Sequence, residues 1–222
     1  MARSYSSSDG LANPWLIGAL AILAMATFFE VDGGLFSRDT LEDRLAEFSD
    51  LDAELTPRIP AQTDITAPDR PLLDPAYTAT PLHFFTVEAL VLSRKTYRHD
   101  TEAGISPVDL MLGWGPMSNP SVVSQIRMRQ SRRFGYVSTR ADADVDLDAL
   151  SPFWTNAHLI PNSPEIAEAL DGIAAGDVLR LEGALVDVHG PDGWRWETST
   201  SRTDTGNGAC EILLVTAVHV LR

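Results

Sequence analysis

The chain has one cysteine, Cys210, and five histidines, among them His158. A thiol and an imidazole are the minimal pair for nucleophilic catalysis, and Asp204 could orient the imidazole. The pair therefore predicts a hydrolase or a transferase. A structural role competes with this interpretation, because a cysteine that opens an apolar strand is usually an inert small hydrophobic residue. His158 borders Leu159-Ile160 and suits a structural hydrogen bond, so we favour the structural role for both residues.

A second candidate site is the polar segment from Thr198 to Gly208. Three of its side chains, Arg202, Asp204 and Asn207, could bind a polar or anionic ligand, with Arg202 as the charged anchor. The alternative is a surface loop whose short polar side chains bond their own backbone, and we favour it. If the protein has a function beyond tethering, this segment is where the sequence places it.

Two tryptophans precede that segment. Trp194 and Trp196 would point to the same face of a strand, with Arg195 on the other face. They could form a platform on which a sugar or a base stacks. Packing in the core is the more frequent role for such residues, and the same two interpretations apply to Trp114 and Trp154.

Metal binding is weakly indicated. The alternating acids Asp142, Asp144, Asp146 and Asp148 resemble part of a calcium loop, but the sixth position is not glycine and the twelfth is Phe153. A solvated acidic edge that prevents strand pairing explains the run better. The sequence has no H-x-x-x-H or C-x-x-C pair, which disfavours zinc. We therefore expect no metal and no cofactor.

Three motifs carry a resemblance to a known family. They are GWGPMS at 113–118, NAHLIP at 156–161, and PDGWRW at 191–196 followed by DTGNGACE at 204–211. Over residues 82–215 the chain resembles a family of bacterial membrane-anchored proteins with no assigned activity. The resemblance implies a bacterial host and a single domain, and it carries over no catalytic residue.

An uncharged apolar run, Trp15–Phe29, determines the expected location. At about 1.5 Å per residue it spans about 22 Å, so it must extend over residues 14–31 to approach the ~30 Å hydrocarbon core. We expect a transmembrane anchor there, after a tail at 1–13. A signal peptide cleaved at Ala24-Met25-Ala26 and the core helix of a soluble protein are the alternatives.

The orientation of the anchor follows from its flanks only weakly. Arg3 precedes the run, and Arg38 and Arg44 follow it, so the count of basic residues does not favour a cytoplasmic N-terminus. Short N-terminal tails usually stay inside the cell. We therefore expect an anchor in the bacterial inner membrane and a periplasmic C-terminal domain.

Two segments join the anchor to that domain. Residues 32–52 are acidic and contain an expected amphipathic helix at 40–51, with Leu41, Leu45, Phe48 and Leu51 on one stripe. Such a helix is marginal alone and should dock on the domain, the membrane or a partner helix; its acidity favours a protein partner or a homo-oligomer over anionic lipid. Six prolines at 53–81 predict an extended, semi-rigid spacer.

Residues 82–222 predict a mainly β (α+β) domain. Ser106-Pro107 is typical of a helix start, with the helix ending at Gly113, and Ser163-Pro164-Glu165 opens the main helix at 164–174. Strands are expected at 82–93, 126–137 (a pair or a bent strand), 178–188, 194–200 and 210–221. This order predicts a small OB-like Greek-key barrel with a helical insertion after the first strand; a split β-barrel or an α+β roll would look similar.

The charge of the chain limits its partners. The formal net charge is −14, which argues against binding to a phosphate backbone and so against nucleic acid. The layout of anchor, helix, spacer and domain, without a recognisable catalytic constellation, favours a non-enzymatic protein that binds a protein or envelope ligand. A membrane-tethered hydrolase or transferase that uses Cys210 and His158 is the alternative.

The expected topology can be tested with reporter fusions. Alkaline phosphatase folds only outside the cytoplasm, so a fusion after Arg222 should be active. An inactive phosphatase beside an active cytoplasmic reporter at the same position would contradict the periplasmic assignment.

Overall fold

The computed structural model describes residues 35–48, 53–201 and 209–222, with side chains described from Leu41 onward. The chain divides into two units, Met1–Gly34 and Leu35–Arg222, and the described residues all belong to the second. The expected tail (1–13) and anchor (14–31) therefore lie outside the described residues. Within the described part, no helix is both long enough and apolar enough to cross a membrane.

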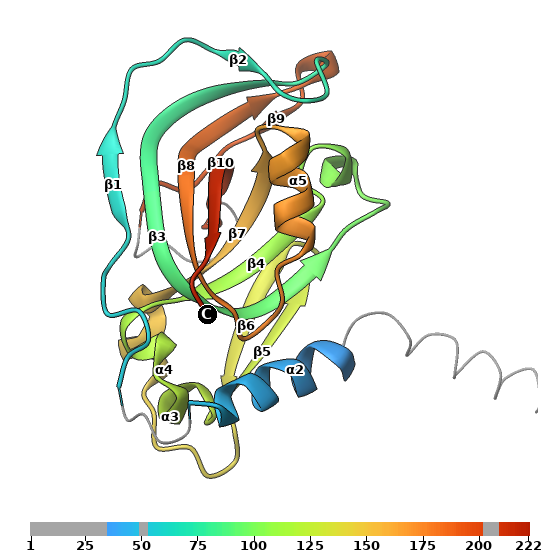
Figure 1. Ribbon diagram of the computed structural model, residues 1–222. Helices are drawn as coiled ribbons and strands as arrows, with labels where there is room; N and C mark the ends of the chain where they lie inside the picture. The colour runs from blue at the N-terminus through green and yellow to red at the C-terminus, as the bar shows by residue number, and fades with distance from the viewer. Residues whose placement is uncertain (1–34, 49–52, 202–208) are drawn as a thin grey trace, which may run out of the picture. The chain divides into compact units, whose positions relative to one another are not determined.

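The described part is mainly β, as expected, and its main sheet is strongly curled (Figure 1). The strands of that sheet are β1 (Ala61–Asp64), β2 (Arg70–Pro71), β3 (Thr78–Thr96), β4 (Val108–Gly113), β7 (Trp154–Pro161), β8 (Val178–His189), β9 (Arg195–Trp196) and β10 (Ile212–Val220). They follow the order β1-β3-β4-β7-β10-β8-β9, and β2 pairs with β3. Because β3 pairs with β4 and also with β8, the sheet curls back on itself along β3.

The inside of the curl holds one apolar core. Its side chains alternate along the strands, as a sheet with a buried inner face requires. They include the expected inward face of the first strand, Phe85, Val87, Ala89 and Val91, together with Leu110, Leu112, Leu159, Leu179, Leu181 and Leu213. Trp114 belongs to the same cluster and is 1 % exposed, so its core role is confirmed.

The main helix forms where it was expected and covers part of this core. α5 spans Pro164–Asp171 and lies between β7 and β8 in the chain. The Ser163 side chain accepts a hydrogen bond from the backbone N–H of Ile166 at 3.3 Å and so caps the helix. Leu170 and Ile173 pack into the core from this side.

The prediction of a helix from Ser106 to Gly113 is wrong. These residues form β4, which is buried along its whole length and pairs with β3 on one side and β7 on the other. A strand covered on both faces shows no alternation of polar and apolar residues, so the Ser-Pro pair before it resembled a helix start. β7 was not expected at all.

The helical insertion follows the second long strand instead of the first. The chain between β4 and β7 contains α3 (Pro120–Val123), α4 (Leu147–Leu150), 3₁₀ turns at Gly115–Ser118 and Ser151–Phe153, and a separate two-stranded sheet. That sheet is a hairpin of β5 (Ile126–Ser131) and β6 (Phe134–Thr139), which confirms the strand pair expected at 126–137. A further 3₁₀ turn, Thr101–Gly104, lies between β3 and β4.

The proline-rich residues 53–81 do not form a free spacer. β1 and β2 pair with β3, and Leu72 is buried beside Ala79. The backbone N–H of Thr56 donates to Ser118 Oγ at 3.0 Å. Proline is tolerated on an edge strand, because there its missing N–H need not remove a hydrogen bond to a neighbouring strand. A segment rich in proline could therefore still join the sheet.

The acidic helix docks on its own domain. α2 spans Leu35–Ala46, and its Leu41 and Leu45 are buried in a cluster with Leu90 and Leu92 on the outside of the curled sheet. Arg44 Nη2 lies 2.8 Å from Asp177 Oδ1 and holds the helix there. The apolar face of these two leucines is therefore covered by the domain, and a homo-oligomer through residues 40–51 stays a prediction.

Gly183 provides a test of the closure along β3. It lies in β8 between β3 and β10, and a Cβ at this position would collide with the carbonyl oxygen of Leu214. Gly183→Ala should therefore lower the free energy of unfolding by about 1–3 kcal/mol or more. Gly104→Ala is the control, because a Cβ there meets nothing within 4 Å. Thermal melts in which both variants match the wild type would contradict the close approach.

Candidate functional site

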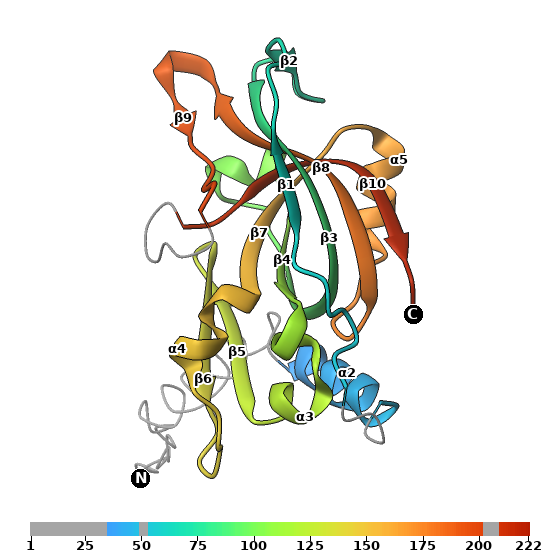
Figure 2. The ribbon, with the colours of Figure 1, turned by 90° about the vertical axis from the view of Figure 1, so that its left-hand side faces the viewer.

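One pocket brings together residues from distant parts of the chain. Its volume is about 560 Å³. Its lining comes from the 3₁₀ turn before β4, the tip of the β5–β6 hairpin, β7, β9 and the start of the segment leading into β10; the residues are Glu102, Arg132, Arg133, Phe134, His158, Arg195, Trp196, Glu197 and Cys210. Figure 2 shows the hairpin tip reaching the beginning of β10. Three of the residues predicted as site candidates, Cys210, His158 and Trp196, thus meet here.

The hairpin tip is a strained turn made of two arginines. Ser131 pairs with Phe134, so Arg132 and Arg133 alone form the turn, and their φ values are 50° and 66°. A two-residue turn with two positive φ values normally takes Asn-Gly, because larger side chains are disfavoured in this region. Such strain persists only where surrounding contacts hold the residues in place.

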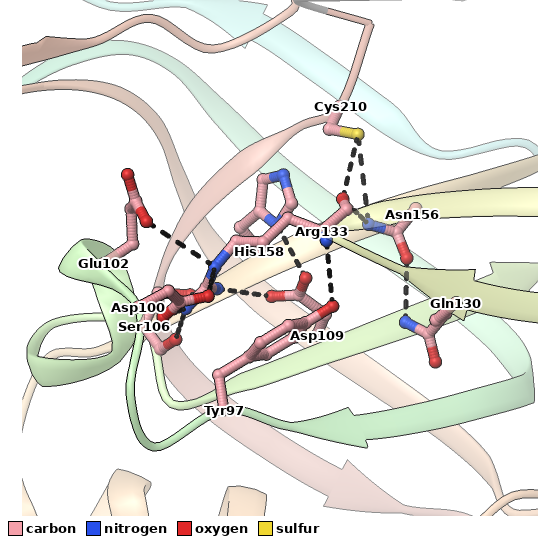
Figure 3. A network of polar contacts seen from close by, with 10 residues as sticks. All are labelled: Tyr97, Asp100, Glu102, Ser106, Asp109, Gln130, Arg133, Asn156, His158 and Cys210. Atoms are coloured by element: carbon pink, nitrogen blue, oxygen red, sulfur yellow. Dashed lines mark hydrogen bonds and ion pairs between the residues drawn. The ribbon is translucent and has the colours of Figure 1, made fainter. Parts of the chain in front are cut away.

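Arg133 supplies those contacts (Figure 3). Its Nε and Nη2 donate to the two carboxylate oxygens of Asp100, each at 2.8 Å, while Nη1 donates to Asp109 Oδ1 at 3.0 Å. Nη2 also donates to the carbonyl of Ser106 at 3.0 Å, and the guanidinium lies 4.0 Å from the centre of the Tyr97 ring. The Arg133 side chain therefore ties the turn to Asp109 of β4 and to the connection between β3 and β4.

These contacts change how two neighbours titrate. The hydrogen bonds from Arg133 hold the pKa of the Asp100 carboxyl below its usual value. Burial, and then the negative charge of Asp109, raise the pKa of Tyr97. The phenol therefore stays neutral, and its oxygen accepts a hydrogen bond from the backbone N–H of Arg133 at 3.1 Å.

Asp109 and His158 face each other across the β4–β7 ladder. They are register partners, and His158 Nδ1 lies 3.0 Å from Asp109 Oδ2. The side chain of Asp109 is fully buried and that of His158 is 5 % exposed. The contact is an ion-pair distance only: neither atom makes a hydrogen bond, to the other or to any further described residue. Because a carboxylate can only accept, the proton belongs on Nδ1, which leaves Nε2 of a neutral imidazole as an acceptor.

Cys210 reaches the same pocket from the segment before β10. Its Sγ lies 3.8 Å from the carbonyl oxygen of Arg133 and 3.9 Å from Nδ2 of Asn156. Asn156 is itself held by two hydrogen bonds: Nδ2 donates to the Arg133 carbonyl at 2.9 Å, and Oδ1 accepts from Gln130 at 2.8 Å. The thiol therefore occupies a defined place at the edge of the hairpin tip, on the side toward which His158 Nε2 points (Figure 3).

The two predicted tryptophans have different environments. The ring of Trp196 lies 4.8 Å from that of His158 and lines the pocket. Trp194 packs edge-on against Tyr77 at 5.6 Å, away from the pocket lining. The expected strand at 194–200 is only the two residues of β9, so the platform reduces to Trp196 alone. Trp154 is half-buried against the outer apolar cluster.

The predicted polar loop is described only at its ends. Arg202, Asp204 and Asn207 lie outside the described residues. At the loop's ends, Ser199 N–H donates to the Cys210 carbonyl at 3.0 Å, and Ile212 N–H donates to Thr198 Oγ1 at 2.8 Å. The ends of the segment are therefore joined beside the pocket.

Two central residues of the site were missed in the sequence. Asp109 was assigned to the first turn of a helix, although an aspartate inside the apolar run Val108–Leu112 was a signal of a buried polar role. Arg133 was predicted to lie on the polar face of a strand. Residues 131–134 include no Gly, Pro, Asn or Asp, so the sequence did not indicate a turn there. Within the described residues, no cluster of three His, Cys, Asp or Glu side chains is placed so that it could hold a metal ion.

Comparison with known proteins adds no identity to this site. No protein-family model, no curated protein and no solved structure matches the chain. The assignment of function therefore depends on the geometry of the pocket.

The role of Arg133 can be tested through stability. Arg133→Ala leaves the buried Asp109 carboxylate without its guanidinium, which should cost about 3–5 kcal/mol in the free energy of unfolding. Arg127→Ala, an exposed arginine on the same hairpin, should change it by less than about 0.5 kcal/mol.

The loss of stability caused by Arg133→Ala should depend on pH. The pKa of Asp100 is lower in the folded protein than in the unfolded chain, so its stabilising contribution is present above the unfolded value and is lost as the pH falls through the folded value. The stability difference between wild type and Arg133→Ala should accordingly narrow as denaturation is measured at decreasing pH below about 4. A difference that stays constant or widens would show that Asp100 is not coupled to Arg133.

Proposed function

We propose that the protein is a membrane-tethered domain that binds a protein or envelope ligand in the pocket at the tip of the β5–β6 hairpin. The observation that carries this proposal is the convergence of three separate connections and two strands on one pocket of about 560 Å³. That volume lies in the range of pockets that bind small molecules or a side chain of a partner, about 300–1,000 Å³.

We further propose that the curled sheet is an OB-like barrel, with the split β-barrel as the alternative. In chain order its five long strands are β3, β4, β7, β8 and β10. The pairings run β3-β4-β7-β10-β8 and back to β3, with β7 and β10 parallel and α5 between the third and fourth strands. This arrangement supports an OB-like topology.

The analogy to OB folds also supports the position of the site. OB folds bind ligands on the outer face of strands two and three and with the loops that follow strands one and four. Here Glu102 comes from the connection after β3, His158 from the outer face of β7, and Trp196 and Cys210 from the connection after β8. This is a likeness of fold, and the chemistry of the ligand has to come from the residues themselves.

The lining of the pocket suits a ligand with both charged and flat apolar parts. Arg132 and Arg195 have no ion-pair partner among the described residues, Glu197 adds a carboxylate, and Phe134 and Trp196 add aromatic surface. A peptide or a sugar with charged substituents matches this mixture. A nucleic acid matches it less well, because the net charge of −14 opposes a phosphate backbone.

The proposed tether is the apolar run at 15–29. Extended to residues 14–31, it approaches the thickness of the hydrocarbon core, which supports an anchor in the bacterial inner membrane, and the short tail before it supports a periplasmic position for the domain. In that compartment the ligand would be a component of the envelope or a protein exposed to it.

Site-specific photo-crosslinking tests the binding site and captures the ligand whatever its class. Benzoylphenylalanine in place of Arg195 or Arg132 in the full chain, irradiated in intact cells, should give a defined adduct. The same amino acid in place of Arg127, on the hairpin but outside the pocket lining, should give none. Adding Trp196→Ala should reduce the adduct at least tenfold.

The nature of the adduct separates the two ligand classes. Mass spectrometry distinguishes a crosslinked protein from a glycan fragment, and either would support the proposal. Identical adducts from positions 195 and 127, or no adduct from either pocket position, would overturn it.

A further inference from the structure

We propose that the pocket is also a catalytic site for acyl transfer, with Cys210 as the nucleophile, His158 as its base, and Asp109 as the residue that positions the imidazole. The proposal rests on the binding pocket described above, because the substrate would have to enter it. It develops the alternative that the sequence left open, and it replaces Asp204 by Asp109 in the positioning role.

His158 has the environment of a general base. Its side chain is 5 % exposed, yet the residue lines the pocket. Nδ1 lies 3.0 Å from Asp109 Oδ2, and among the described residues Nε2 has no hydrogen-bond partner. A nearly buried imidazole that a carboxylate holds at one nitrogen, with the other nitrogen directed into a pocket, is suited to taking a proton from a nucleophile.

Asp109 is costly to bury. A carboxylate with no exposed surface is unfavourable unless cations and hydrogen bonds compensate it. Here a whole hairpin turn is strained to bring Arg133 within 3.0 Å of one oxygen, and the other oxygen faces His158. A fold that needed only packing at this place could have used an apolar residue, and charged groups of this kind are concentrated at functional sites.

Cys210 lies where a thiolate can be stabilised. The thiol lines the same pocket as His158. The Asn156 amide nitrogen lies 3.9 Å from Sγ, close enough for an amide N–H to donate a hydrogen bond to the sulfur. The charged groups around the pair are Asp109, Arg133, Glu102, Arg132, Arg195 and Glu197. The two arginines without ion-pair partners among the described residues add positive charge that favours the thiolate and can hold a negative group on a substrate.

The chemistry that this set can perform is the transfer of an acyl group from an ester or a thioester. His158 Nε2 takes the proton of the thiol as Sγ attacks the carbonyl carbon. A C–S bond forms, the bond from carbon to the leaving oxygen or sulfur breaks, and the proton passes from Nε2 to the leaving group. Water then attacks the acyl-Cys210, gives its proton to Nε2, and the released thiolate recovers that proton, so the enzyme returns to its starting state.

The reactivity of Cys210 gives the first test, because it is the only thiol in the chain. The full-length protein is alkylated with iodoacetamide at a series of pH values, and the product is quantified by mass spectrometry. An activated cysteine should react with an inflection below the ordinary thiol value of about 8.5. His158→Gln should slow the reaction at pH 7 at least tenfold and move the inflection upward.

Two further variants make this test specific. His219→Gln, an exposed histidine on β10, is the control and should leave the profile unchanged. Asp109→Asn should move the profile in the same direction as His158→Gln, which a purely structural aspartate would not do in a variant that still melts cooperatively. A profile that is the same in the wild type and in both site variants would overturn the proposal.

Turnover of an ester gives the second test. With p-nitrophenyl acetate, the wild type should release nitrophenol in a burst and carry one acetyl group on Cys210, and Cys210→Ser should abolish both. Acetylation at other residues only, or a burst that survives in Cys210→Ser, would contradict catalysis. If Cys210→Ser shows no acylation but still gives the photo-crosslinks, the pocket binds its ligand without the proposed catalysis. If Cys210 is acylated but no photo-crosslinks form, only the proposed ligand is overturned.

Discussion

The pairing of β3 with β8 is the constraint on which the rest of the structure depends. β3 is nineteen residues long, and it carries β8 along its first part and β4 along its last part. Because β4 and β8 both pair with this strand, the sheet curls back on itself, so its inner face encloses an apolar core and the outer faces of β4 and β7 become a platform. Asp109 and His158 stand on that platform as direct neighbours, and the hairpin tip lies over them.

The site is built by polar contacts between elements that share no strand ladder. The hairpin has its own two-stranded sheet, and Arg133 attaches it to Asp109 of β4 and to Asp100 in the connection between β3 and β4. Asn156 and Gln130 add a second attachment, from β7 to β5. The bond between Gln130 and Asn156 is buried and the bond between Arg133 and Asp109 is partly buried, and the low local dielectric strengthens such bonds. The position of the pocket is thus defined by electrostatics as much as by packing.

The parts of the fold and of the site that could be predicted from sequence are those with a local signal. Ser163-Pro164-Glu165 indicated a capped helix, and Cys210 and His158, which line the pocket, were singled out by type as weak candidates, because few residues can supply a nucleophile or a base. β4 could not be recognised, because burial on both faces removes the alternation that identifies a strand. The docking of α2 and the pairing of β1 depend on partners far away in the chain. Asp109 and Arg133 acquire their roles from a strand register and from a turn without turn-forming residues, so these required the fold.

The separation of the hairpin from the main sheet also has an evolutionary consequence. β5 and β6 pair only with each other, so substitutions along them leave the strand register of the core unchanged. One wall of the pocket can therefore vary in length and charge while the wall formed by His158 of β7 stays fixed. Related chains could acquire different ligand preferences by altering this hairpin alone, provided that Arg133 and Gln130, whose side chains attach the hairpin to the rest of the domain, are kept.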